Sequence, residues 1–301
     1  MWKNIDFPDR NTPIDLNMKI LSDPMEMQRA AMALRMERHT LALVPTMGCL
    51  HAGHLSLVRE AARRAEQVIL SLFVNPIQFG PNEDFSRYPR PFERDADLCR
   101  NAGVHILFAP EPAGMYAPNA SVFVDEDRIS RGLCGAARPG HFKGVLTVVA
   151  KLFNLCRPNV AIFGQKDAQQ ARLIRQMARD LNFPIEIVVA PIVRESDGLA
   201  MSSRNRYLSD TDRQNALCLH RGLHAARSAF EAGERSSAAL KTIVGAKIAA
   251  APGAGVEYIE IVDADSFEPI AAIERPALMV LAVRFGTTRL IDNLELKPAA
   301  H

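Results

Sequence analysis

Residues 42–57 read ALVPTMGCLHAGHLSL: a short apolar run, then a turn with two glycines and two histidines, then an apolar pattern with helical spacing. The run predicts a buried strand and the later spacing predicts a helix. Gly48 and Gly53 stand between them, with His51 and His54 three residues apart. In open parallel sheets, ligands bind where a strand ends and a helix begins. This stretch therefore indicates both the expected fold and the place to look for function.

The same alternation continues along the chain and predicts an α/β protein. Its strands are continuously apolar, which is typical of a parallel sheet covered by helices on both faces. After a helix at 24–38 and the strand at 41–44, the pattern predicts strands at 68–74, 104–108, 160–163 and 185–190, and helices at 54–65, 92–102, 145–155 and 168–181.

The C-terminal third follows a different order and predicts a second, smaller α+β domain. A polar segment, 191–208, precedes it. Helical stretches are expected at 211–231 and 237–250, and strands at 256–262, 278–283 and 290–292. We therefore expect an N-terminal extension at 1–17, a parallel-sheet domain at 18–193 and the α+β domain at 194–301.

Composition limits the class of protein. The chain has 301 residues with 36 basic and 34 acidic side chains, and this near-balance argues against a nucleic-acid coat or a membrane-surface protein. Its five cysteines form no CxxC pair, which favours a reducing compartment over a disulfide framework. The polar N-terminus does not resemble a signal peptide, and no apolar run reaches the roughly 18 residues of a membrane helix. We expect a cytoplasmic protein.

The turn at His51 and His54 is suited to a phosphate. A helix N-terminus offers unpaired N–H groups and partial positive charge, and both imidazoles can donate hydrogen bonds. The fingerprints GxGxxG and GxxxxGK[ST] are absent from the turn. Taken alone, two histidines are better explained by a chance pair that caps the helix or binds a metal.

Amides and charged groups follow two other predicted strands. Asn75 and Gln78 come after the strand at 68–74, where they could orient a small polar substrate. Asn-Pro favours a turn by itself, and for this motif alone the turn is the better explanation. After the strand at 160–163, Lys166 is a point charge suited to phosphate, whereas Asp167 could simply cap a helix. Gln170 shares a helix face with Asp167.

A polar loop between the two expected domains carries Ser202, Ser203 and Arg204. Two hydroxyls and a guanidinium would make a flexible anion clamp, and the alternative is an ordinary solvated loop. Together with Lys166 and the two histidines, Arg204 could neutralise a triphosphate.

These motifs resemble the HxGH nucleotidyltransferase superfamily, in which class I aminoacyl-tRNA synthetases carry HIGH and KMSKS. Within it, residues 18–293 resemble the pantothenate synthetase (pantoate–β-alanine ligase) family. The resemblance is carried, in order, by PTMGCLHAGHLSLV, LFVNPIQF, DFSRYPR, RPGHFKGV, KLFNL, FGQKDAQQ, PIVRESDGLAMSSRNRYL and RLIDN.

The resemblance implies a Rossmann-like N-terminal domain, a C-terminal lid domain and a homodimer. It also implies ATP with Mg²⁺, pantoate and β-alanine as reactants, and a pantoyl-adenylate intermediate that is converted to pantothenate with release of AMP and pyrophosphate. The ATP contacts that it implies are Met47, Gly48, Cys49, Leu50, His51, Ala52, Gly53 and His54; Gly164, Gln165, Lys166 and Asp167; and Val193, Met201, Ser202, Ser203 and Arg204.

The other roles also come from the resemblance. Gln78, with Asn75 and Met47, would bind pantoate and β-alanine, and Gln170 would bind pantoate. His54 would be the proton donor, and His51, Lys166, Ser202, Ser203 and Arg204 would assist catalysis. Asp95 is a weaker candidate near magnesium. The chain departs from related sequences at Gln165, where glutamate is often found, and at Cys134, where some of them carry glutamate.

Three rival functions stay open from the sequence. The first is another adenylate-forming or nucleotidyl-transferring enzyme. The second is a tRNA-binding relative of the synthetases, against which the near-neutral charge argues. The third is an ATP sensor without catalytic activity.

Overall fold

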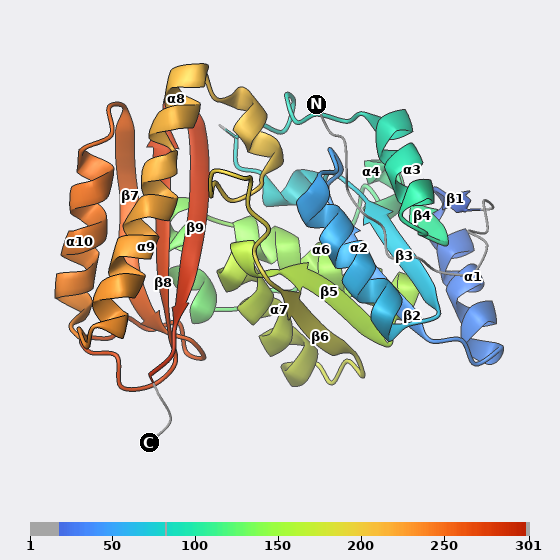
Figure 1. Cartoon of the computed structure of the whole chain (residues 1–301). Coiled ribbons are helices and arrows are strands. Elements are labelled where there is room, and N and C mark those ends of the chain that lie inside the picture. Colours follow the sequence, from blue (N-terminus) through green and yellow to red (C-terminus); the bar gives the residue numbers. More distant parts are fainter. Residues whose placement is uncertain (1–17, 82, 299–301) are drawn as a thin grey trace. The chain divides into compact units, whose positions relative to one another are not determined.

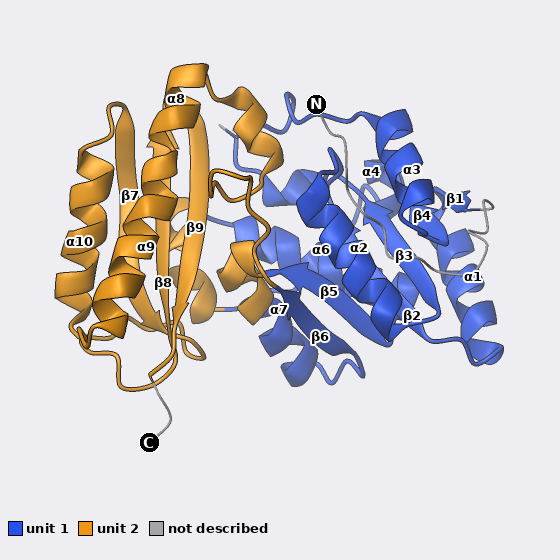
Figure 2. Cartoon of the chain, viewed as in Figure 1, with its two compact units in different colours: residues 1–126, 138–164, 173–190 blue, residues 127–137, 165–172, 191–301 orange. Residues whose placement is uncertain are grey.

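The computed structural model describes residues 18–81 and 83–298, so the predicted extension 1–17 lies outside the described residues. The described chain divides into two compact units, which Figure 2 colours separately. Unit 1 comprises the described residues up to 126 together with 138–164 and 173–190, and unit 2 comprises 127–137, 165–172 and the described residues from 191 onward.

Unit 1 contains a six-stranded sheet in which every neighbouring pair is parallel (Figure 1). The strand order is β1-β4-β3-β2-β5-β6. This confirms the predicted parallel α/β sheet. The strands are β1 Lys19–Leu21, β2 Leu41–Thr46, β3 Gln67–Leu72, β4 Ile106–Phe108, β5 Val160–Gly164 and β6 Glu186–Ala190.

Both faces of this sheet are buried at its four inner strands, β4, β3, β2 and β5, which explains why these strands are continuously apolar. Val44, Leu70 and Ile162 pack in one core with residues such as Val58 of α2. Leu43, between Ala42 and Val44 on β2, is equally buried. Helices α1 Pro24–Met36, α2 Ala52–Arg64, α3 Phe92–Asn101, α4 Pro112–Met115 and α6 His141–Cys156 belong to unit 1, and α7 Ala168–Asp180 crosses the division between the units.

The order of the strands locates the expected ligand site. Along the chain the sheet grows from β2 to β3 and β4, and then reverses to place β5 on the other side of β2. In open α/β sheets, ligands bind outside the carboxyl ends of the strands at such a reversal. The turn with the two histidines follows β2 directly, and Gly164 ends β5.

Unit 2 is the predicted smaller α+β domain, and it has its own core. An antiparallel sheet of β7 Ala254–Asp263, β8 Ala277–Phe285 and β9 Thr288–Leu296 packs with two helices, α9 Leu217–Glu231 and α10 Ser237–Ala249. Two short helices also belong to this unit, α5 Cys134–Ala137 and α8 Asp210–Asn215. None of the helices in the described part of the chain is both long and apolar enough to span a bilayer.

Three details differ from the sequence predictions. The helix expected at 211–231 is two helices, because the chain tightens at Ala216, whose carbonyl accepts from the N–H of Leu219 three residues on. Strand β1 was not predicted, since three residues carry no periodicity. Segments 127–137 and 165–172 group with unit 2, whereas the sequence places the domain boundary at residue 193; that boundary stays a prediction.

Two helical glycines give a paired test of packing in the two units. A β-carbon on Gly144 of α6 would lie 2.4 Å from the carbonyl oxygen of Ile77 and 2.6 Å from Cα of Gln78, both of which are backbone atoms. On Gly245 of α10, the nearest atom would be a side-chain carbon 3.9 Å away. We expect Gly144→Ala to lower the free energy of unfolding by about 1–3 kcal/mol through overpacking.

For the matched control, Gly245→Ala, we expect a change of opposite sign in the free energy of unfolding. Gly245→Ala should raise the free energy of unfolding by about 0.5–1 kcal/mol, because alanine is the better helix former and the site has room for it. Urea unfolding followed by circular dichroism measures both. A stabilising Gly144→Ala would show that α6 does not approach the backbone of 77–78 so closely.

Candidate functional site

The turn after β2 has a strained backbone that is held by one buried carboxylate. Gly48 and Cys49 have φ of 81° and 52°, a region that glycine tolerates and cysteine rarely adopts. Asp95 of α3 is completely buried, and its two oxygens accept from the N–H groups of Cys49 at 2.6 Å and Leu50 at 2.9 Å. Asp95 therefore fixes the turn that presents the two histidines.

The two histidines cap helix α2. His51 is the N-cap residue, and its Nδ1 accepts from the N–H of Gly53 at 3.1 Å, while Nδ1 of His54 accepts from the N–H of His51 at 3.3 Å. Together they form a reciprocal capping box. The expectation of unpaired backbone N–H groups for a phosphate is therefore wrong for Cys49, Leu50, His51 and Gly53. The alternative in which the histidines cap the helix therefore holds for the Nδ1 atom of each ring.

The caps also decide where each ring carries its proton. A nitrogen that accepts from an N–H group has no proton of its own, so in a neutral ring the proton is on Nε2. His51 and His54 lie with their ring centroids 4.1 Å apart, and each ring therefore has an Nε2–H donor. This turn therefore offers an anion two side-chain donors, while four of its backbone N–H groups are already bonded within the protein.

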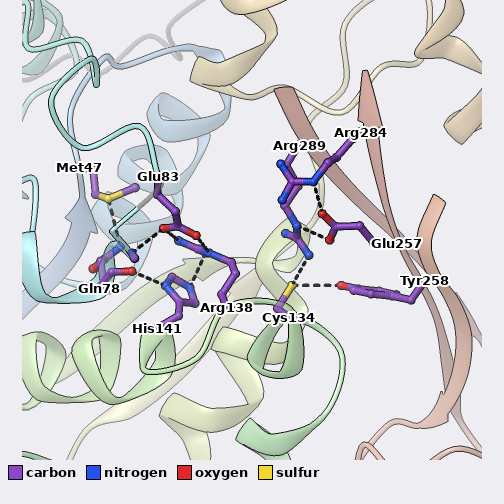
Figure 3. Close-up of polar contacts among 11 residues, drawn as sticks. Met47, Gln78, Glu83, Cys134, Arg138, His141, Glu257, Tyr258, Arg284 and Arg289 are labelled. Carbon is purple, nitrogen blue, oxygen red and sulfur yellow. Dashed lines mark hydrogen bonds and ion pairs between the residues drawn. The ribbon is translucent and has the colours of Figure 1, made fainter. Parts of the chain in front are cut away.

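Gln78 is the centre of a second group of contacts in unit 1 (Figure 3). It is buried, its Oε1 accepts from Nδ2 of Asn75 at 3.0 Å, and its Nε2 donates to the sulfur of Met47 at 3.2 Å. Asn75 also donates to the carbonyl of Gly144 and accepts from the hydroxyl of Tyr116 at 2.8 Å. Both N–H donors of Asn75 are therefore used, and the residue acts by orienting Gln78.

The backbone of Gln78 is held from the other side by the RPGHF segment. Nδ1 of His141 lies 2.9 Å from the carbonyl oxygen of Gln78, and Nη1 of Arg138 lies 2.8 Å from Nε2 of His141. A carbonyl only accepts and a guanidinium only donates, so His141 is neutral with its proton on Nδ1. Arg138 in turn makes a two-bond ion pair with Glu83, as Figure 3 shows. The sequence contained this motif, but nothing in it indicated these partners.

In unit 2, the segment after β5 carries the predicted lysine. The 3₁₀ turn η3 Gln165–Asp167 leads directly into α7, and Lys166 forms an ion pair with Asp167 at 3.7 Å. About a fifth of the Lys166 side chain is exposed. A partly buried ammonium held this way is suited to bind an anion as a point charge.

The two adjacent glutamines of α7 have different roles. Gln169 is buried and bonds to the segment around α5, donating to the carbonyls of Ile129 at 2.7 Å and Gly132 at 3.0 Å and accepting from the N–H of Cys134. The predicted ligand Gln170 is half-buried. The structural task of Gln169 leaves Gln170 as the glutamine suited to a ligand.

The loop with the two serines is an ordered hairpin. Arg194 and Ala200 form a β-bridge, and the N–H of Met201 donates to the carbonyl of Val193 at 3.0 Å. Ser202 caps the 3₁₀ turn η4 Ser203–Tyr207 by accepting from the N–H of Arg204. The structure gives this segment several hydrogen bonds and leaves Ser202, Ser203 and Arg204 half-buried, which disfavours the alternative of an ordinary solvated loop. The anion clamp stays a prediction.

Cys134, one of the two departures noted in the sequence, belongs to a polar cluster of unit 2 (Figure 3). Its sulfur lies 3.1 Å from the hydroxyl of Tyr258 and 3.4 Å from Arg289. Burial raises the pKa of Tyr258. Glu257 bonds both Arg284 and Arg289, so the guanidinium that Cys134 approaches already has a carboxylate partner.

The predicted site residues are thus divided between the units. Unit 1 holds Asn75, Gln78, Asp95, Met47 through His54, and Gly164; unit 2 holds Gln165, Lys166, Asp167, Gln170, Val193, and Met201 through Arg204. Within 18–81 and 83–298, no three His, Cys, Asp or Glu side chains cluster as metal ligands would. The role of Asp95 near magnesium stays a prediction, and its carboxylate here has a structural task.

Comparison with known proteins identifies relatives over nearly the whole chain. The family model for pantoate-beta-alanine ligase matches residues 19–295. The pantothenate synthetase of Chloroherpeton thalassium is 51% identical over 93% of this chain and 100% of its own length. The crystal structure of pantothenate synthetase from Thermus thermophilus is 45% identical with a TM-score of 0.89, covering 93% of this chain and 100% of that one.

A third relative is described with bound molecules. The pantoate-beta-alanine ligase of Francisella tularensis, complexed with beta-gamma ATP and β-alanine, has a TM-score of 0.76 and 32% identity over 92% of this chain and 97% of its own.

The buried carboxylate can be tested through stability. Asp95→Asn turns one acceptor into a donor that faces a backbone N–H group. We expect the free energy of unfolding to fall by about 2–3 kcal/mol, as for a lost hydrogen bond to a buried charge. Asp97→Asn is the control on the same helix, because the Asp97 side chain is 69% exposed; its effect should stay within about 0.5 kcal/mol. Equal effects of the two variants in urea unfolding would contradict a structural role for Asp95.

The ion pair between Glu83 and Arg138 should make the stability of the protein depend on pH in the acid range. Burial raises the pKa of this carboxyl, but the hydrogen bonds and charge of Arg138 outweigh burial and lower the pKa to about 2 from 4.5. A lowered folded-state pKa stabilises the protein above the unfolded value, and this stability disappears as pH falls from about 4.5 to 2. Glu83→Gln should therefore be less stable by about 1–2 kcal/mol at neutral pH, allowing for solvent screening.

The difference should shrink as the pH falls through that window. Urea midpoints at a series of pH values measure it, with the exposed Glu111→Gln as the control. A pH-independent gap between wild type and Glu83→Gln would show that the ion pair is not its source.

Proposed function

The chain belongs to the pantoate–β-alanine ligase family and catalyses the ATP-dependent formation of pantothenate; we propose that it does so through a pantoyl-adenylate. The observation that carries the proposal is that the family match spans residues 19–295, and so includes every residue proposed for the site in both units.

The chemistry requires activation, because a carboxylate oxygen is a poor leaving group. In the first step the pantoate carboxylate attacks the α-phosphorus of ATP, and pyrophosphate leaves with the bonding electron pair. In the second step the amine of β-alanine attacks the acyl carbon, loses a proton and expels AMP. Neither step needs a nucleophile from the protein. The protein would contribute positioning and stabilisation of charge.

The phosphate groups would be bound by donors that each unit supplies. In unit 1, the Nε2–H groups of His51 and His54 would donate hydrogen bonds to phosphate oxygens, and His54 would in this way stabilise the charge that builds on the departing pyrophosphate. In unit 2, Lys166 and Arg204 would supply positive charge, and Ser202 and Ser203 would donate from the ordered hairpin. Gly164 would let the nucleotide approach the backbone at the end of β5.

Pantoate and β-alanine would be oriented mainly by amides. Gln78 has one N–H directed to Met47, and its amide retains further hydrogen-bonding capacity toward the hydroxyl and carboxylate groups of pantoate. Asn75 supports Gln78, and Gln170 would bind pantoate from α7. A buried amide held on several sides loses little freedom on binding, which favours an oriented substrate.

Magnesium would enter with ATP. Mg²⁺ usually binds substrate phosphates and keeps several waters, with one or two carboxylates from the protein. Asp95, the carboxylate that the resemblance suggests, already accepts from two backbone N–H groups. When bound, the ion would neutralise phosphate charge, and we derive no step through it.

Three further features rest on the family resemblance and on composition. We propose a homodimer, a cytoplasmic location, and closure of the C-terminal domain as a lid that protects the acyl-adenylate from water. Among the rival functions, another adenylate-forming enzyme would be distinguished by its acid substrate, and an ATP sensor would release no pyrophosphate.

The adenylate route is tested by isotope exchange. Labelled pyrophosphate should exchange into ATP when pantoate is present and β-alanine is absent. Exchange that requires β-alanine would exclude a free-standing adenylate step. His54→Ala and Lys166→Ala should each reduce exchange by at least about 10²–10³-fold while the circular dichroism spectrum is unchanged. Lys247→Ala, an exposed lysine of α10, is the control and should exchange normally.

A further inference from the structure

Two adjacent polar residues lie buried in the edge strand of unit 2. Asp292 and Asn293 belong to the RLIDN segment of β9 and are 2% and 4% exposed. Strand β9 pairs only with β8 in the described sheet, and it also contacts η3 and η4. Burying an amide and a carboxylate is unfavourable unless each is fully hydrogen-bonded, so their partners show what they do.

Asn293 binds the backbone of the turn that carries Lys166. Its Nδ2 donates to the carbonyls of Gln165 at 2.9 Å and Lys166 at 3.1 Å, and its Oδ1 accepts from Nε2 of Gln165 at 3.2 Å. Both donors are used on carbonyls, which can only accept, and this fixes the orientation of the amide. One side chain therefore fixes the peptide groups on both sides of the Lys166 α-carbon.

Asp292 binds the base of the serine hairpin. Its oxygens accept from the guanidinium of Arg194 at 2.7 and 2.9 Å, and Oδ1 also accepts from the N–H of Asn293. Arg194 donates in addition to the carbonyl of Gly198 and forms the β-bridge with Ala200. This hairpin leads directly into 202–204.

We propose that Asp292 and Asn293 are positioning residues of the ligase reaction. Asn293 fixes the backbone at Lys166, and Asp292 fixes the base of the hairpin that leads into Ser202–Arg204. The inference rests on the proposed ATP-binding role of those segments. A buried ion pair alone seldom stabilises more than apolar side chains of the same volume. Apolar side chains could not hydrogen-bond the two segments that carry Lys166 and Arg204, the cations proposed to bind ATP, whereas Asp292 and Asn293 each bond one of these segments.

A double-mutant cycle on the full-length chain tests the inference. Asn293→Asp is nearly isosteric, removes both N–H donors and places a carboxylate against two carbonyls. We expect it to reduce pantoate-dependent pyrophosphate exchange by about 100-fold, the cost of a displacement of roughly 1 Å. The loss should appear in kcat and in the KM for ATP, with the KM for pantoate unchanged. In the Lys166→Ala background the same substitution should cost less than about threefold, because the residue acts through Lys166.

A matched control separates positioning from stability. Asp263→Asn alters another buried carboxylate of the same sheet, which bonds the N–H groups of Asp265 and Ser266. It should lower the urea midpoint, and any effect on exchange should be the same with and without Lys166. If Asn293→Asp does not fold, Asn293→Ser, which removes the carboxamide without adding a charge, goes through the same cycle.

The possible outcomes distinguish a failure of the positioning role from a failure of the proposed function. Independent, multiplicative losses for Asn293 and Lys166 would overturn the positioning role while leaving the proposed function intact. No exchange by the wild-type chain, or full exchange by Lys166→Ala, would overturn the proposed role of Lys166 and the inference with it. Coupled losses restricted to ATP parameters would support the inference.

Discussion

The arrangement around the histidines depends on the Asp95 carboxylate. Gly48 and Cys49 adopt left-handed conformations, and the N–H groups of the residues that follow each of them, Cys49 and Leu50, are bound by the two oxygens of the buried Asp95. That contact ends β2 and lets α2 begin with His51 as its cap. It also removes these N–H groups from ligand binding, so an anion at this turn would be bound by side chains.

A similar arrangement recurs at other proposed binding segments, where a buried polar residue holds a residue that is proposed to bind substrate. Asn75 and His141 hold Gln78 by its side chain and by its carbonyl. Asn293 holds the backbone around Lys166. Preorganised donors lower a barrier because they need no rearrangement as charge develops. The buried network is the part of the structure that provides this preorganisation.

The sequence predicted the elements well and their contacts poorly. Apolar runs and helical spacing are local patterns, so the parallel sheet and the α+β domain were predictable, whereas β1 was too short to show a period. Asp95 is 46 and 45 residues from the two N–H groups that it binds, and no pattern connects them. Likewise, the sequence alone cannot distinguish the adjacent glutamines Gln169 and Gln170. Only the hydrogen bonds of Gln169 to the segment around α5 show that it is structural and that Gln170 is the candidate ligand.

The capping bonds have a consequence for charge. Each imidazole uses Nδ1 as an acceptor, so protonating that nitrogen would break the bond that begins the helix. The rings are therefore suited to donate from Nε2 as neutral groups. A triphosphate also needs positive charge, and the residues proposed to supply it are Lys166 and Arg204, whose charge does not depend on such capping bonds. A point charge on a flexible stem is selective only if its base is fixed, and that is the task assigned to the strand pair Asp292 and Asn293.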